Sequence, residues 1–176
     1  ILLEGGATAV IEGTGTFVGH PNHGDNVATN GAGIYAENAT VIVSNQACIG
    51  SNYAYRQGGG LFLSNSTLYL DAATVGTILT DRPINAREGG GVYARDSAVW
   101  AMNGSHVRNG RASYGAGIYA SNSLVILTGD TIVGHADTNL ANVASIRGGG
   151  VYALDTAVVC ANTRIEGNRS GAYGGG

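Results

Sequence analysis

The chain has 176 residues and a net charge of −3, with glycine at 30 positions and proline at only two. This length suffices for one domain with a hydrophobic core, the glycines lack the period of three that collagen requires, and the acidic balance gives no basic footprint for nucleic acid. No apolar run approaches the roughly 18 residues of a membrane span, so we expect a chain that does not cross a membrane in this segment.

A glycine cluster followed by two bulky residues recurs along the chain. Copies begin at Gly31 (GAGIYAENA), Gly58 (GGGLFLSNS), Gly89 (GGGVYARDS), Gly115 (GAGIYASNS) and Gly148 (GGGVYALDT), and another begins at Gly174. LLEGGAT, residues 2–8, is a degenerate earlier copy. Repeats of this length are typical of solenoids. Both chain ends fall inside the pattern, so we expect a single-domain fragment (1–176) of a longer solenoid, with coils starting near residues 1, 31, 58, 89, 115 and 148.

Each copy has the pattern of three short strands and no helix. The first follows the glycines, the second contains apolar runs such as VIV, LYL and VWA, and the third contains segments such as CIGSN and TVGT. Val, Ile and Tyr favour strands, whereas Gly and Asn interrupt them. The pattern predicts an all-β fold, a parallel β-helix with three short strands per coil.

One position after the first strand holds Asn or Asp in five copies. These residue types tolerate the left-handed backbone conformation of a tight bend, and stacked coils would align them along the axis. We interpret the position as a turn ladder whose side chains bond from coil to coil. The alternative is a set of acids and amides directed at a ligand. The ladder consists of Asn38, Asn65, Asp96, Asn122 and Asp155.

Alternation along the first strand separates a core face from an outer face. Ile34 and Leu61 belong to a wholly apolar face, which we assign to the core. The other face carries one aromatic residue per copy, and we expect these residues to form a column on the surface that serves for binding. The column consists of Tyr35, Phe62, Tyr93, Tyr119 and Tyr152.

The second strand is apolar on both faces. Val41 and Leu68 are expected to point inward, and the residues between the inward positions are apolar as well. Such a stripe is unusual on the surface of a soluble monomer, and strands of this kind are commonly covered on both sides. We expect another copy, another segment of the chain or the three long loops (residues 20–30, 77–88 and 135–147) to cover it, with simple exposure as the remaining alternative. The stripe consists of Ile42, Tyr69, Trp100 and Ile126.

The sequence contains few residues whose spacing suggests a catalytic or metal-binding site. His20, His23 and Asp25 have a spacing that could bind a metal, but the loop offers no fourth ligand. Asp81, Arg82, Arg87 and Glu88 lie within one loop, where a solvated cluster of ion pairs is expected. The remaining acids are scattered and give no acid–base pair. We therefore expect no catalytic residues, no metal and no cofactor.

The two cysteines, Cys48 and Cys160, fall on coils four apart, which corresponds to about 19 Å of strand stacking. A disulfide needs Cα atoms within about 7 Å. We expect two free thiols, with Cys160 buried.

RNGRASYGAGIYA (108–120) and EGNRSGAYGGG (166–176) resemble the repeats of polymorphic outer membrane proteins and related bacterial autotransporter passengers, which pair a GGAI-type motif with an FxxN-type motif. Residues 49–52 and 165–168 keep the x-x-N spacing without the Phe. The resemblance covers nearly the whole chain. It implies a right-handed parallel β-helix, here of about six coils, export to the cell surface, and an adhesive or structural role.

These observations favour a structural repeat module of an exported, extracellular bacterial protein, either an adhesin stalk or a filament subunit. Its partners would be other copies of itself or other segments of the same chain, bound through the aromatic column and the apolar stripe. The alternatives are a carbohydrate-binding or polysaccharide-cleaving module, with host or matrix glycans on the aromatic column, and a phage tail or fibre component. No nucleic-acid partner is expected.

Overall fold

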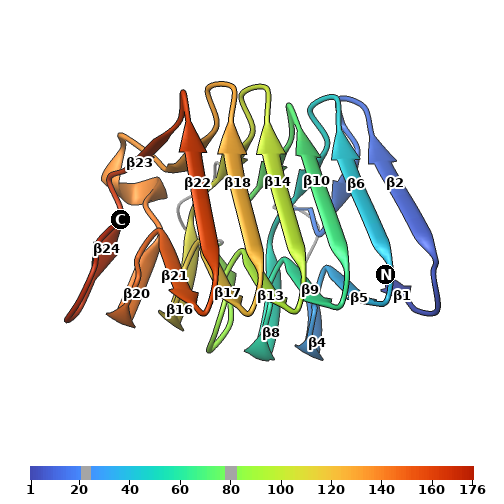
Figure 1. The fold of residues 1–176 in the computed structure, drawn as a ribbon, viewed down its shortest axis with the longest axis horizontal. Coiled ribbons are helices and arrows are strands. Elements are labelled where there is room, and N and C mark those ends of the chain that lie inside the picture. The colour runs from blue at the N-terminus through green and yellow to red at the C-terminus, as the bar shows by residue number, and fades with distance from the viewer. Residues whose placement is uncertain (21–24, 78–82) are drawn as a thin grey trace.

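The computed structural model describes residues 1–20, 25–77 and 83–176. Within them the chain winds as a right-handed parallel β-helix (Figure 1), and the helical part there is one 3-10 turn, η1 (Thr138–Leu140). Each strand pairs in parallel with the equivalent strand of the next coil, which produces four sheets of six strands in the described part of the chain. The predicted all-β class and parallel β-helix are confirmed.

The first and second sheets contain the two strands that follow each glycine cluster. The first sheet contains β1 (Leu2–Leu3), β5 (Ile34–Glu37), β9 (Leu61–Ser64), β13 (Val92–Arg95), β17 (Ile118–Ser121) and β21 (Val151–Leu154). The second contains β2 (Thr8–Glu12), β6 (Thr40–Ser44), β10 (Thr67–Asp71), β14 (Ala98–Met102), β18 (Leu124–Thr128) and β22 (Ala157–Ala161). The second sheet is the array of six parallel arrows at the front of Figure 1.

The third and fourth sheets complete each coil. The third contains β3 (Phe17–Val18), β7 (Cys48–Ile49), β11 (Thr74–Val75), β15 (His106–Val107), β19 (Ile132–Gly134) and β23 (Arg164–Glu166). The fourth contains β4 (Asn26–Asn30), β8 (Asn52–Gln57), β12 (Ile84–Asn85), β16 (Gly110–Tyr114), β20 (Val143–Arg147) and β24 (Arg169–Ser170).

The fourth sheet corrects the expected three strands per coil. Its strands β4, β12 and β20 lie inside the segments that the sequence predicted as long loops. The pairing of β4 with β8 and of β16 with β20 shifts register partway along, which is the signature of a β-bulge. A bulge interrupts the alternation of inward and outward residues, and β12 is only two residues long, so the sequence pattern of a strand is weak here.

The core lies between the sheets and runs along the axis. The inward residues of the central coils have no exposed surface, as Ile34, Leu61, Val41 and Leu68 illustrate, and this part of the prediction is confirmed. Full burial of an aliphatic side chain contributes about 1.5–3 kcal/mol relative to exposure. The sixth coil differs, because no coil is stacked over its outer side in the structure, and Val158 is 38% exposed.

The glycine clusters form the corner between the fourth and first sheets. The first glycine of a cluster adopts a positive φ, 63° at Gly58 for example, which a residue without a Cβ adopts at no steric cost. The third glycine faces a neighbouring coil. A Cβ on Gly117 would lie 2.5 Å from the carbonyl oxygen of Gly150, and 2.8 Å from Nδ2 of Asn142. In the repeated motif the first glycine therefore permits a tight bend, and the third glycine allows the neighbouring coil to approach closely.

Candidate functional site

The five residues of the predicted turn ladder occupy the corner between the first and second sheets. All five have positive φ, between 46° and 52°. Nδ2 of Asn65 donates to Oδ1 of Asn38, and Nδ2 of Asn122 donates to Oδ1 of Asp96, both at 2.6 Å. These bonds join neighbouring coils, as the structural interpretation of the sequence anticipates. The fifth member, Asp155, continues the file on the next coil.

A row of hydroxyl groups accompanies this corner one residue further along the chain. Oγ of Ser97 donates to the carbonyl of Arg95 at 2.6 Å and accepts the backbone N–H of Ser66 at 3.0 Å. The same pair of bonds repeats at Ser123 and at Thr156. Each hydroxyl thus satisfies a backbone donor of the preceding coil that would otherwise be buried and unpaired.

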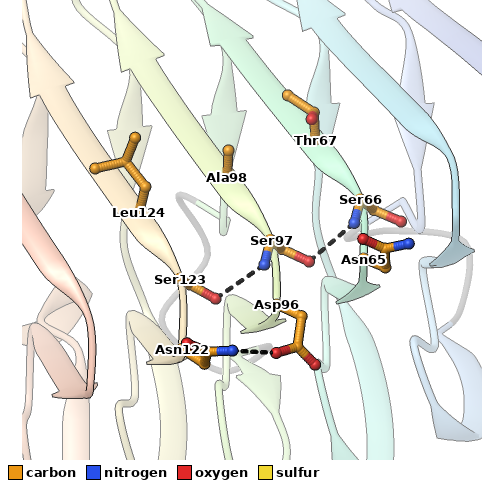
Figure 2. A pocket seen from close by; sticks show the side chains of 9 residues that line it. All are labelled: Asn65, Ser66, Thr67, Asp96, Ser97, Ala98, Asn122, Ser123 and Leu124. Atoms are coloured by element: carbon orange, nitrogen blue, oxygen red, sulfur yellow. Dashed lines mark hydrogen bonds between the residues drawn. The ribbon is translucent and has the colours of Figure 1, made fainter.

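Figure 2 shows both rows along a shallow groove of about 470 Å³. Thr67, Ala98 and Leu124 form the side of the groove that belongs to the second sheet. The polar bonds drawn in it run from one coil to the next. We interpret this groove as a structural seam, because its amides and hydroxyls are used for coil-to-coil bonding.

The aromatic column is a continuous stack of rings. Ring centroids lie 4.7 Å apart between Tyr35 and Phe62, 5.2 Å between Phe62 and Tyr93, and 5.0 Å between Tyr93 and Tyr119, with interplanar angles of 11° or less. Tyr152 continues the stack at 5.4 Å with a tilt of 39°. Each ring in the middle therefore covers the faces of its neighbours.

The expectation that this column lies on the surface is wrong for its middle. Phe62 is 4% exposed and Tyr93 is 6% exposed. Burial, followed by the nearby Glu88 carboxylate, raises the pKa of Tyr93, and the same two causes raise the pKa of Tyr119 to about 12. The phenols therefore stay neutral over the physiological pH range. A sugar ring cannot stack on faces that neighbouring rings already cover, so the middle of the column offers no platform for glycans.

The outward stripe of the second sheet is accessible. Tyr69 is 37% exposed, while Ile42, Trp100 and Ile126 are half-buried. Tyr69 and Trp100 stack with centroids 6.4 Å apart. The strand register places Val10 and Val159 at the two ends of the same stripe, and these are 57% and 47% exposed. The sequence left open whether another copy, another segment of the chain or the long loops cover this stripe. In the structure no described segment of this chain covers it completely.

A second row of asparagines lies inside the solenoid, where the third sheet turns into the fourth. Asn142 has no exposed surface, and Asn52 is 1% exposed. Oδ1 of Asn142 accepts the N–H of Gly110 at 2.9 Å, and its Nδ2 donates to the carbonyl of Val107 at 2.9 Å and to Oδ1 of Asn168 at 3.0 Å. The x-x-N spacing marked Asn52 and Asn168 in the sequence, but it did not mark Asn142 and did not show that these side chains face inward.

The fourth sheet presents two exposed tyrosines that are not among the candidate residues predicted from the sequence. Tyr53 and Tyr55 are 42% and 64% exposed and meet edge to face, with centroids 5.3 Å apart and an angle of 79°. They line a groove of about 260 Å³ together with Asn85 and Arg87. The alternating segment NYAYR was the available signal.

The remaining candidate residues from the sequence are those of the possible metal site and of the charged loop. His20 and Asp25 are described, whereas His23, Asp81 and Arg82 lie outside the described residues. Among residues 1–20, 25–77 and 83–176, no group of three His, Cys, Asp or Glu residues could hold a metal ion. No helix in the described part of the chain has the length and apolar character needed to cross a membrane.

The prediction of two free thiols is confirmed. Cys48 is half-buried, its Sγ donates to the carbonyl of Gly76 at 3.1 Å, and burial raises its pKa to about 11. The prediction that Cys160 is buried is wrong, because the inner side of β22 is open on the last coil.

Comparisons with known proteins do not assign the chain to a family, since no family model, no curated protein and no solved structure matches it.

Proposed function

We propose that this chain is a structural repeat module of an exported bacterial surface protein, a rigid rod segment that associates with a second copy through the outer face of the second sheet. The observation that carries the proposal is the apolar stripe on that face, which is accessible from Val10 to Val159. Contiguous exposed apolar surface of this kind marks interaction sites in soluble proteins.

The composition of the face favours a second copy as its occupant. The outward residues beside the stripe are mostly uncharged. The acids Glu12 and Asp71 lie on one edge, at the ends of β2 and β10, two coils apart with Ser44 of β6 between them. A flat, apolar and nearly uncharged sheet is complementary to itself, as a two-fold interface requires. Two such sheets pack face to face at about 10 Å.

The size of the face predicts weak association. Five-residue strands at about 3.3 Å per residue and six strands at about 4.8 Å spacing give a plane of roughly 450 Å². A stable complex usually buries about 800 Å² per partner. We therefore expect a reversible dimer that forms with rising protein concentration. Several modules in tandem would associate with higher affinity, because the second contact forms within an existing complex.

The extracellular location is supported by the resemblance of the repeats to surface-exported bacterial proteins. A solenoid suits that role, because each coil is stabilised by its neighbours and the rod needs no disulfides. Immunolabelling of intact cells of the source organism tests the location. Labelling that requires permeabilised cells would contradict export without affecting the association of the purified module.

Sedimentation equilibrium over a wide concentration range tests the association. We expect the average mass of the wild type to rise with concentration and that of the double variant Tyr69→Ser/Trp100→Ser to stay monomeric. Tyr55→Ser is the matched control, because it removes an exposed aromatic ring from the fourth sheet and should leave association unchanged. A wild type that is monomeric at every concentration, or a double variant that associates equally well, would refute the proposal.

A further inference from the structure

The two tyrosines of the fourth sheet form an open aromatic corner on the outer surface. In contrast to the rings of the stacked column, their faces are not covered by parallel neighbours, since the two rings stand at 79° to each other. Tyr55 is 64% exposed, among the highest values for a large side chain in the described residues. Aromatic faces that remain accessible beside a polar groove are suited to stacking on the apolar side of a sugar ring.

A β-bulge in β8 brings an arginine to the same side. Ala28 pairs with Ala54 and Asn30 pairs with Gln57, so β8 has one residue more than β4 in this stretch. The backbone N–H groups of Arg87 and Glu88 both donate to the carbonyl of Arg56, at 2.9 and 3.0 Å. As a result Tyr55 and Arg56, which are consecutive, are both exposed. Bulges commonly redirect side chains in this way at functional sites.

Two guanidinium groups beside the tyrosines are available for an anion. Arg56 and Arg87 are exposed, and neither has an ion pair or side-chain hydrogen bond among the described residues. The adjacent acid Glu88 accepts a hydrogen bond from the side-chain amide of Gln57 at 2.8 Å, and it forms no ion pair with Arg56 or Arg87 among the described residues. Arg111 is occupied by the carbonyl of Ala141 at 2.7 Å.

We propose that the groove lined by Tyr53, Tyr55, Asn85 and Arg87 binds a carboxylated sugar residue of an acidic polysaccharide. The tyrosine rings contact the apolar face of the sugar, and the amide of Asn85 bonds a hydroxyl group. Arg87, assisted by Arg56, binds the carboxylate, for which the guanidinium fork is the matching partner. The volume of about 260 Å³ falls just below the roughly 300–1,000 Å³ of drug-sized pockets, which suits one sugar ring of a longer chain.

A polysaccharide fits this surface better than a single-stranded nucleic acid. Nucleic-acid channels combine successive stacking platforms with a basic track along the phosphates. Here the tyrosines form one perpendicular pair, the described residues beside them offer two guanidinium groups without an ion pair or side-chain hydrogen bond, those of Arg56 and Arg87, and the chain has a net charge of −3. The site lies on the fourth sheet and does not depend on the association proposed for the second.

Isothermal titration calorimetry with a hyaluronan hexasaccharide, whose glucuronates carry the carboxylates, tests the proposal. We expect binding that weakens at least tenfold when the same hexasaccharide is methyl-esterified, and at least tenfold in Tyr55→Ala and in Arg87→Gln. Tyr55→Phe keeps the ring and should retain most of the affinity. Tyr69→Ala, an exposed aromatic on the second sheet, is the matched control and should bind like the wild type.

Circular dichroism melting curves first establish that the variants fold like the wild type, so that a loss of affinity reports on the binding site. Absence of hexasaccharide binding, equal affinity for the methyl ester, or equal losses in Tyr55→Ala and Tyr69→Ala would each overturn the proposal. Oligothymidylate that binds more tightly than the hexasaccharide at the same salt concentration would overturn it in favour of a nucleic-acid site. Should Arg87→Gln fail to fold, Arg56→Gln gives the same test of the charge.

Discussion

Two rows of asparagines run along this solenoid, one outside the corner between the first and second sheets and one inside the corner between the third and fourth. Asn65 in the outer row is exposed and donates to Asn38. Asn142 in the inner row is fully buried and uses both its oxygen and its nitrogen. Asn65 and Asn142 are the same residue type in the same repeat, but the free-energy cost of losing the amide depends on whether water can replace it.

The largest effect is expected from the inner row. Asn142→Ala removes the acceptor of the Gly110 N–H and the donor to the carbonyl of Val107, and leaves both buried. Each unsatisfied buried group costs about 1–3 kcal/mol, so the free energy of unfolding should fall by about 3–5 kcal/mol. Urea denaturation followed by circular dichroism measures this loss.

Asn122→Ala in the outer row is the matched control and should cost much less, because water replaces its partners. If Asn142→Ala lost no more stability than Asn122→Ala, burial would not be the difference between the two rows.

The contrast between the rows also explains what the sequence could predict. The outer row stands at a fixed distance from the glycine cluster, and Asn and Asp at a tight bend have a local backbone reason to be there. The x-x-N spacing marks Asn52 and Asn168 of the inner row, but it gives no local reason for burial, since asparagine is mostly exposed in proteins. Only the stacking of coils determines that residues such as Asn52 face inward.

The other differences between the predictions from the sequence and the structure also have physical causes. Alternation correctly assigned the core residues of the first two sheets, such as Ile34 and Leu68. It also placed the aromatic column on the outer side of the first sheet, but alternation contains no information on how stacked rings such as Phe62 and Tyr93 cover each other. The candidate sugar site was missed because its residues come from two coils, and only the pairing of β8 with β12 places Asn85 beside Tyr53.

An intermediate effect should come from the backbone conformation of the outer row. Asn65 has φ 47°, a region that costs a residue with a Cβ roughly 1–2 kcal/mol unless it is Asn or Asp. Asn65→Ala should therefore lower the free energy of unfolding by about 1 kcal/mol, while Asn65→Gly should be nearly neutral. Thermal melts of the two variants, compared side by side, provide the measurement. Equal losses would show that the side-chain bond to Asn38, and not the backbone conformation, is what the outer row contributes.

The smallest effect should come from charge within the outer row. Asn122 lies between Asp96 and Asp155 along the axis and donates to the Asp96 carboxylate. Asn122→Asp replaces that donor with a like charge on an exposed surface and should cost about 0.5 kcal/mol at low ionic strength, a loss that 1 M salt largely screens. Asn38→Asp is the matched control, because Asn38 already acts as the acceptor of Asn65 and its oxygen is retained. Chemical denaturation in urea, with and without salt, distinguishes the two variants. A loss in Asn38→Asp as large as that in Asn122→Asp would mean that the neighbouring carboxylates do not determine which amides the outer row requires.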